Sequence, residues 1–335
     1  MCSSDPPKQV FAGKYLRLVK SETAFDFFKR GKMWLGLSGI MVVVAFVSFM
    51  AQGLNFGIDF KGGTTLRTES TQEIDVAEYR SVVAALDLGE VTITEVFDPT
   101  FGEDKHVATV AIQVQEGEES VSNETIQAVE AALHTIDPNM TFPATESVGP
   151  TVSGELIQSA IIAVVLAIGA VLAYIWMRFE WQFALGAVAA LMHDVLLTIG
   201  IFSALQIRFD LAIIAALLTI VGSSLNDTVV VFDRVRENLR KYKAKDLKDV
   251  MNRSINETLS RTFMTSFTTL LALISLYVLG GDVIRGFVFA MIWGVIIGTY
   301  SSIFVASTTL LVLGVKRDWS KEANKVGGQY ADIDA

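Results

Sequence analysis

The sequence has few of the residues that build disulfides and metal centres. It contains one cysteine, Cys2, and three histidines among 335 residues. A single cysteine excludes an intrachain disulfide, and no Cys/His spacing typical of a metal centre occurs. We interpret Cys2 as a free thiol, because it has no apolar run of the lipobox kind before it. The sequence therefore predicts neither a metal site nor a cofactor.

The motifs of nucleotide hydrolysis and of common hydrolases are also absent. The sequence has no GxxxxGK[ST] loop, no HExxH helix and no GxSxG turn. We therefore expect neither an enzyme nor a nucleic-acid partner. If the chain performs work, the energy must come from an ion gradient or from a partner. One charge crossing a membrane gains about 2.3 kcal/mol per 100 mV.

Apolar residues are abundant, and they are grouped. They make up 51% of the chain, whereas charged residues make up 19%, and the mean hydropathy is +0.46. These values are typical of an integral membrane protein in a lipid bilayer. A spanning helix needs about 20 apolar residues. Six segments qualify: 33–51, 156–177, 182–205, 211–232, 262–279 and 286–314.

Charge is distributed unevenly along the chain. Residues 57–150 contain eighteen Asp and Glu against four Lys and Arg, whereas basic residues cluster before the first predicted span and after the fourth. By the positive-inside rule, both termini are cytoplasmic and the acidic segment lies on the other side. The predicted parts are a cytoplasmic segment 1–32, a first span within 33–55, an outer domain 56–150, five spans within 151–314 with a cytoplasmic loop at about 234–261, and a cytoplasmic tail 315–335.

The outer domain alternates between strand and helix patterns. Strand patterns occur at 64–68, 91–97, 106–114 and 142–148, and helix patterns occur at 74–88 and 123–136. The order βαββαβ is that of the split-βαβ, ferredoxin-like unit, which is an α+β fold. Nothing in this segment looks catalytic, so we interpret it as a binding or mechanical module.

Ionisable residues interrupt the predicted spans, where a charge is costly and is usually functional. Asp227 lies in the fourth span, and Arg261 lies at the start of the fifth. If the helices are neighbours, Arg261 favours the charged carboxylate while burial favours the neutral one, which suits an ion carrier. Arg261 could instead be a positive-inside anchor. We select Asp227 and Arg261 as ion-coupling residues, and His193, Asp194, Asn226 and Ser223 as relay or packing residues.

Two further patterns favour structural roles. Gly294 and Gly298 form a GxxxG pair, which indicates close helix packing. Four charged residues fall just past the fourth span, where we expect ion pairs at the membrane interface: Asp233, Arg234, Arg236 and Glu237.

Six short motifs occur in order along the chain. FGIDFKGGT at 56–64 follows the first span, and its glycine pair suits a tight turn from a membrane helix into a strand. We interpret as structural the motif residues Gly57, Asp59, Gly62, Gly63, Gly149 and Pro150. The other motifs are VGP at 148–150, MRFE at 177–180, HDV at 193–195, SLNDTVVVFDRVREN at 224–238 and RT at 261–262. Together they resemble the SecF side of the SecD/SecF family of protein-export membrane subunits.

The resemblance implies six transmembrane helices, half of a resistance-nodulation-division (RND) bundle, plus a periplasmic ferredoxin-like domain in a bacterial inner membrane. Family members pair with SecD and assist the SecYEG channel and the SecA motor. They use the proton motive force to promote export of unfolded polypeptides. Asp227 matches the family's transmembrane Asp, and Arg261 matches its partner Arg. The sequence leaves open whether the ion is H⁺ or Na⁺, and whether Asp227 titrates or modulates a group in a SecD-like chain.

Two other readings compete with this one. The chain could be a half-subunit of an RND-type small-molecule or lipid exporter, which would have a larger outer domain. It could also be a non-titrating membrane scaffold, in which Asp227 only makes a packing hydrogen bond.

Overall fold

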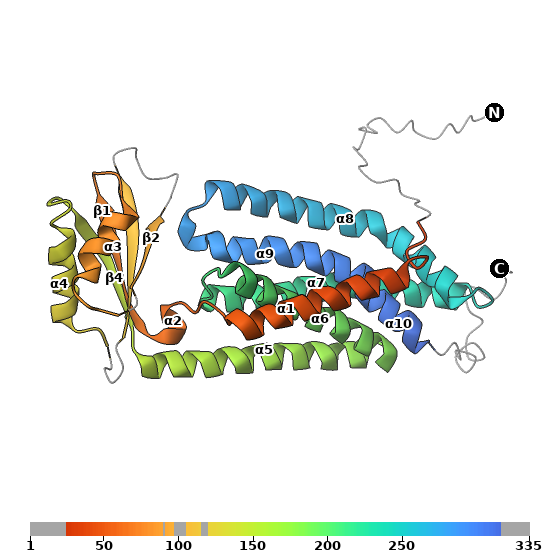
Figure 1. Cartoon of the computed structure of the whole chain (residues 1–335). Helices are drawn as coiled ribbons and strands as arrows, with labels where there is room; N and C mark the ends of the chain where they lie inside the picture. The colour runs from red at the N-terminus through yellow and green to blue at the C-terminus, as the bar shows by residue number, and fades with distance from the viewer. Residues whose placement is uncertain (1–24, 90, 97–104, 115–119, 316–335) are drawn as a thin grey trace, which may run out of the picture.

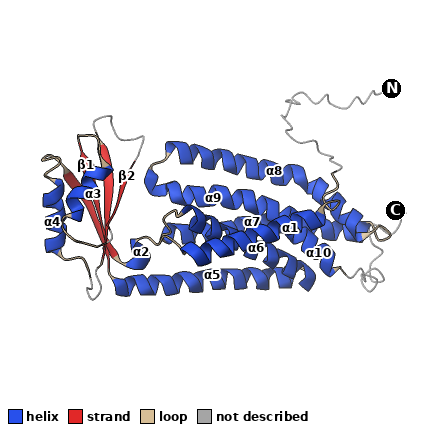
Figure 2. Ribbon diagram, viewed as in Figure 1, coloured by secondary structure: helices blue, strands red, loops and turns tan. Residues whose placement is uncertain are grey.

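A computed structural model describes residues 25–89, 91–96, 105–114 and 120–315. It places a small β-sheet domain at one end of a bundle of long helices (Figures 1 and 2). The first long helix starts, and the last helix ends, at the end of the bundle far from the sheet. Cys2 and most of the predicted tails 1–32 and 315–335 lie outside the described residues.

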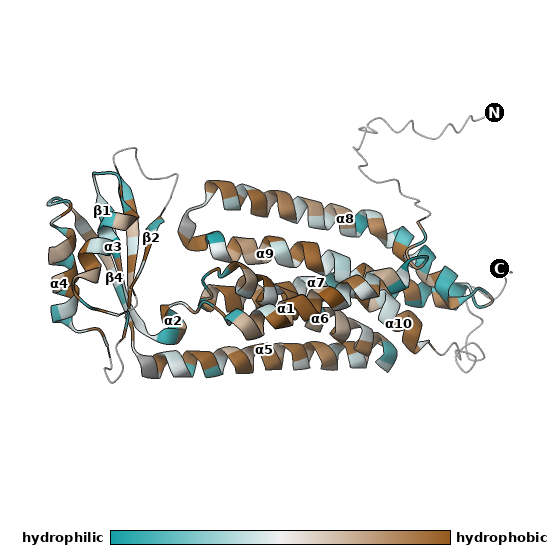
Figure 3. Ribbon diagram, viewed as in Figure 1, coloured by the Kyte–Doolittle hydropathy of each residue, from teal (hydrophilic) through white to brown (hydrophobic). Residues whose placement is uncertain are grey.

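Six helices in the described part of the chain are long and apolar enough to cross a membrane, as the sequence predicts. The bounds are α1 Gly31–Gln52, α5 Pro150–Arg178, α6 Trp181–Leu205, α7 Leu211–Lys241, α8 Leu247–Leu279 and α9 Asp282–Ser301, the last continued by a π-helix, η1 Ser302–Ala306, and by α10 Ser307–Leu313. The segment 234–261, which the sequence indicates as a loop, is mostly helical, because α7 runs to Lys241 and α8 begins at Leu247. Figure 3 shows that this end of α7 and α8 is hydrophilic.

Close helix contacts are made at glycines. A Cβ on Gly200 of α6 would overlap Ala45 of α1, and a Cβ on Gly294 of α9 would overlap Ile220 of α7. Gly298 lies against Ser224. The predicted packing role of the GxxxG pair is therefore confirmed, and α9 approaches α7 closely at the level of the polar residues described below.

The sheet domain contains four strands and two helices in the predicted order. The strands are β1 Gly63–Ser70, β2 Val91–Val96, β3 His106–Gln113 and β4 Thr141–Val148, and the helices are α3 Val76–Ala84 and α4 Asn123–Leu133. The sheet order is β2-β3-β1-β4, and every neighbouring pair is antiparallel. The predicted bounds of each strand agree with the structure to within two residues.

One face of the sheet is covered and the other faces the long helices. Tyr79 of α3 and Leu133 of α4 pack on Val110 in one apolar core. Thr94 and Thr109 lie on the opposite face and line a cavity of about 660 Å³ between the sheet and the ends of the long helices. Alternate residues of a strand point to opposite faces, so Ile93 and Val110 lie in the apolar core while their neighbours Thr94 and Thr109 line the cavity. The sheet face opposite α3 and α4 thus faces the ends of the long helices (Figure 1).

A buried carboxylate ties β1 to the segment before β4. Asp137 accepts hydrogen bonds from Ser70 Oγ at 2.7 Å, from the Thr71 amide at 3.3 Å and from the Asn139 amide at 2.9 Å. These bonds stabilise the charged form, and the Ser70 bond contributes most to holding the Asp137 pKa below its usual value. A lowered folded-state pKa gives stability that is complete above the unfolded-state pKa and is lost as pH falls through the folded-state value.

We expect Asp137→Ala to loosen the outer domain at pH 7. Amide hydrogens of β1 and β4 should exchange faster than in the wild-type chain when both are measured as the purified full-length protein. The difference should shrink as the pH falls below about 4, the ordinary pKa of an Asp carboxyl, and should vanish once the pH has passed through the lower folded-state pKa of Asp137. Equal exchange at pH 7 would show that Asp137 contributes no stability.

Candidate functional site

The FGIDFKGGT motif forms the junction between the first long helix and the sheet. Its residues fold into the short helix α2 Ile58–Lys61 and into the start of β1. Gly62 has φ +76° and Gly63 has φ +156°, and a Cβ on Gly63 would overlap the carbonyl oxygen of Ile112 in β3. Both positions favour glycine for backbone reasons, at the point where the sequence predicts a turn from helix to strand.

The same motif also holds the start of α7. The amide of Gly57 donates to the carbonyl of Phe209 at 2.8 Å, and the amide of Phe209 donates to the carbonyl of Asn55 at 2.7 Å. Asp59 Oδ2 accepts from the amide of Leu211 at 3.0 Å, the first residue of α7. The junction therefore connects the outer domain directly to α7, the helix that carries Asp227.

Gly149 and Pro150 play a similar part at the next junction. Gly149 is the N-cap of α5, and Pro150 stands in its first turn, where proline needs no amide hydrogen bond. β4 ends one residue earlier, at Val148. The VGP motif thus turns the chain from the sheet into the second long helix.

Asp227 and Arg261 lie on neighbouring helices, α7 and α8. The Asp227 carboxylate is half-buried and is attracted by the Arg261 guanidinium. No hydrogen bond or ion pair joins the two side chains, both of which are among the described residues. The pair is therefore close enough to interact electrostatically, yet it is not locked together.

A shallow hollow of about 360 Å³ opens beside this pair between α7 and α8. Arg261 lines it together with Val230, which lies one helical turn beyond Asp227. Its charged lining residues are Asp233, Arg234, Glu237, Glu257 and Arg261. The hollow can bring water to Arg261 from the hydrophilic end of α7 and α8.

A second acidic group, Asp194, lies fully enclosed in the bundle. Its side chain is 1% exposed. Asp194 Oδ2 accepts from Ser224 Oγ of α7 at 2.6 Å and from Ser301 Oγ of α9 at 2.8 Å. Asp194 Oδ1 lies 3.1 Å from His193 Nδ1. One carboxylate therefore joins α6, α7 and α9 at the position where Gly298 lets α9 approach.

Two features mark this cluster as unusual. The π-helix η1 begins immediately after Ser301, and such bulges are frequent at functional sites. His193 Nε2 and Thr228 Oγ1 are buried without a hydrogen-bond partner in the described structure. Buried polar atoms usually have a partner, so each of these two atoms has an unused hydrogen-bonding position.

The predicted relay residues are only partly brought together. His193 and Asp194 are adjacent and buried, whereas Ser223 and Asn226 are exposed on another face of α7. Ser223 donates only to the carbonyl of Ile220 in its own helix, at 3.0 Å. Ser224 and Ser301 complete the cluster, and the sequence reasoning did not select them. A signal for Ser224 was available: it is spaced four and seven residues from the buried Ile220 and Leu217.

The residues past the fourth predicted span form the expected ion pairs. Asp233 pairs with Arg178 of α5 at 3.2 Å, and Glu237 pairs with Arg234 at 2.6 Å. Within the described residues, no group of three or more His, Cys, Asp or Glu could hold a metal ion.

Known proteins with related sequences identify the family of the chain. The family model for the C-terminal part of the protein export membrane proteins SecD/SecF matches residues 128–316, and the SecD/SecF GG motif model matches residues 47–74. The protein translocase subunit SecF of Cereibacter sphaeroides is 59% identical over 96% of this chain and 99% of its own length. SecF of Rhodobacter capsulatus is 55% identical over 92% of this chain and 94% of its own length.

Solved structures of SecDF chains are similar to this one. The crystal structure of SecDF from Thermus thermophilus, described as a translocon-associated membrane protein, is similar with a TM-score of 0.77 and 34% identity over 88% of this chain. SecDF in a super-membrane-facing form gives a TM-score of 0.66 and 35% identity over 91% of this chain. The chain spans 39% and 40% of the lengths of those two SecDF chains. With its GG motif at the α2 turn and its six long apolar helices, the chain is a multi-pass membrane protein that belongs to the SecD/SecF family, on the SecF side.

Proposed function

We propose that this chain is an accessory subunit of a protein translocase that uses an ion gradient to promote export of unfolded polypeptides. The observation that carries the proposal is the half-buried Asp227 on α7, attracted but not bound by Arg261 on α8. Such a carboxylate can bind an ion from one side of the membrane and release it to the other as the arginine moves. Its work is transport, not catalysis.

The proposed partner in the membrane is a SecD-type chain. The helices α1, α5 and α8 expose large apolar side chains over most of their length, which suits contact with lipid or with further helices. The SecDF chains are a little more than twice as long as this one, as expected if they contain a second, SecD-like half. The SecYEG channel, the SecA motor and the exported polypeptide complete the proposed assembly.

The proposed topology follows the charge pattern. We place the chain in a bacterial inner membrane with both termini in the cytoplasm and residues 56–150 in the periplasm. The sheet order β2-β3-β1-β4 and the element order βαββαβ support a ferredoxin-like periplasmic domain. Because α2 ties this domain to the first residue of α7, a movement of α7 would be transmitted to the domain.

The experiment that tests this function is an export assay in membrane vesicles. The chain is reconstituted with SecD and the translocon, an export intermediate is stalled, and its completion is followed with no gradient, with a proton gradient or with a sodium gradient. We expect one gradient to accelerate completion only when the chain is present, and that gradient identifies the ion. Equal rates with and without the chain under both gradients would disprove the proposed function.

A further inference from the structure

We propose that Glu257 is a positioning residue that keeps Arg261 available to Asp227. This inference rests on the proposed function, because it concerns how the Asp227–Arg261 pair is maintained. Glu257 lies on α8, one helical turn before Arg261, and both residues line the hollow between α7 and α8. A glutamate at this spacing from an arginine ordinarily forms an ion pair with it.

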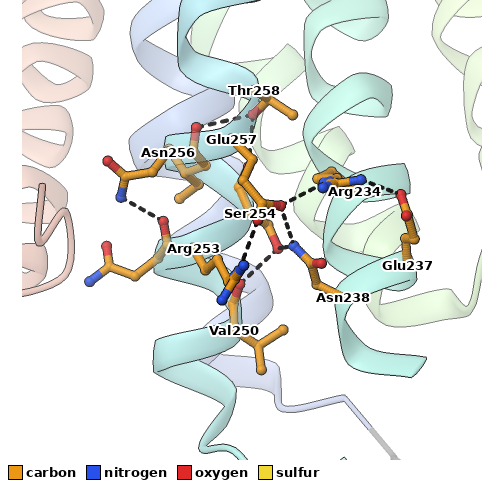
Figure 4. A network of polar contacts seen from close by, with 11 residues as sticks. Arg234, Glu237, Asn238, Val250, Arg253, Ser254, Asn256, Glu257 and Thr258 are labelled. Atoms are coloured by element: carbon orange, nitrogen blue, oxygen red, sulfur yellow. Dashed lines mark hydrogen bonds and ion pairs between the residues drawn. The ribbon is translucent and has the colours of Figure 1, made fainter. Parts of the chain in front are cut away.

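Glu257 is instead occupied by donors from both helices (Figure 4). Its Oε2 accepts from Arg234 Nε at 2.6 Å and from Asn238 Nδ2 at 2.7 Å, both from α7. Its Oε1 accepts from Arg253 Nε at 2.8 Å, from its own helix. Charge-assisted hydrogen bonds of this length are about twice as strong as neutral ones.

The bonds to Glu257 also fix the separation of α7 and α8. Asn238 is 2% exposed, and it donates both to Glu257 and, at 3.0 Å, to Ser254 Oγ of α8. The contact lies about 10 Å along α7 from Asp227, since Arg234 is seven residues further on. We call these hydrogen bonds of Glu257 to Arg234, Asn238 and Arg253 the Glu257 clamp. The clamp sets how close α8, and with it Arg261, lies to Asp227.

As a result, the arginines near Glu257 fall into two groups: those that pair with it, and Arg261, which does not. Arg234 and Arg253 neutralise Glu257, and Arg261 makes no hydrogen bond or ion pair with any described residue, including Glu257. Arg261 is thus not bound to Glu257, and its charge attracts Asp227. If Arg234 is lost, Glu257 can draw Arg261 away from Asp227. If Glu257 is lost, the positive charge near Asp227 increases.

We expect the loss of Glu257 and the loss of Arg234 to shift the pH midpoint of gradient-driven export in opposite directions. A contact with only a structural role would not produce opposite shifts. Gradient-driven completion of a stalled export intermediate is measured against pH in reconstituted vesicles with the SecD-type partner and the translocon. Glu257→Gln should move the pH midpoint to lower pH, because a more positive surrounding disfavours protonation of Asp227. Arg234→Gln should move it to higher pH. At about 10 Å each shift should be about 0.5 to 1 pH unit.

Glu237→Gln is the matched control. Glu237 binds the same Arg234 at the same 2.6 Å, but it lies on the exposed side of that guanidinium and further along α7 from Asp227. Glu237 lies about 15 Å along α7 from Asp227 and is 52% exposed, whereas Glu257 is 24% exposed. Salt screens distant, exposed charges more strongly, so the midpoint of Glu237→Gln should stay near that of the wild-type chain.

Three outcomes would overturn the inference. The midpoints of Glu257→Gln and Arg234→Gln could shift in the same direction, or both could stay unchanged. The midpoint of Glu237→Gln could also shift as much as that of Glu257→Gln. A wild-type complex that gains nothing from any gradient would instead refute the proposed function itself. The two failures are therefore distinguishable.

Discussion

Asp227→Asn is expected to remove the gradient-dependent part of export while leaving the complex assembled. Asparagine has nearly the same size and can make similar hydrogen bonds, but it neither binds nor releases a proton at ordinary pH. The acceleration by the gradient should fall about tenfold or more, in line with the loss of other proton-transferring groups. The assay is the completion of a stalled intermediate, with assembly checked by co-purification of the SecD-type chain.

The neighbouring amide supplies the control. Asn226 is exposed on α7 and has no hydrogen bond among the described contacts, so Asn226→Ala should retain the gradient effect. If the assembled Asp227→Asn complex is still fully accelerated by the gradient, Asp227 only makes a packing hydrogen bond, as the scaffold alternative requires. The ion-coupling group would then have to be sought at Asp194 or in the partner chain.

Asp194→Leu is expected to have the largest effect on stability. It removes the acceptor for Ser224 and the partner of His193, both of which are buried, whereas Ser301 keeps its bond to the carbonyl of Gly298 at 3.2 Å. Hydrogen bonds to a charged group are worth about 1.5 to 3 kcal/mol in water-soluble proteins and less within membranes. We therefore expect the free energy of unfolding to fall by about 3 kcal/mol, as measured by denaturation in detergent micelles.

Two adjacent serines on α7 distinguish the stability that the Asp194 hydrogen bonds contribute from the effect of replacing any serine in this helix. Ser224→Ala should cost about 1 kcal/mol, because Ser224 bonds to Asp194, whereas Ser223→Ala should cost little, because Ser223 bonds only to its own helix. An unchanged free energy of unfolding in Asp194→Leu would contradict this account. Equal free energies of unfolding in Ser224→Ala and Ser223→Ala would also show that the Asp194 cluster does not hold α6, α7 and α9 together.

The sequence was sufficient for the parts of the fold that depend on local pattern. The six apolar segments, the order of strands and helices in the outer domain and the glycine turn all follow from hydrophobic period and backbone conformation. Gly63 illustrates why: its φ of +156° and its contact with Ile112 admit no side chain, so the requirement is visible in the residue type. Approximate positions of His193 and Asp194 within the helices were also predictable.

The parts that depend on which helix face meets which neighbour were not predictable. Ser223 was selected although Ser224 is the buried residue, because a single-residue change on a helix rotates the side chain by about 100°. Ser301 and Asp194 are more than one hundred residues apart, so no local pattern links them. The Glu257 clamp was missed for the same reason, since the sequence indicates a loop where α7 and α8 continue as helices.

The most direct test of the account is a pH titration of the protonated carboxyl group of Asp227, recorded by infrared difference spectroscopy on the purified complex. Subtraction of the Asp227→Asn spectrum isolates this group from all other carboxyls. The account predicts that it titrates within the range in which export responds to the gradient, and that Arg261→Gln moves its midpoint to higher pH because the attraction for the carboxylate is lost. A carboxyl that stays in one protonation state throughout, or a midpoint unchanged by Arg261→Gln, would contradict it.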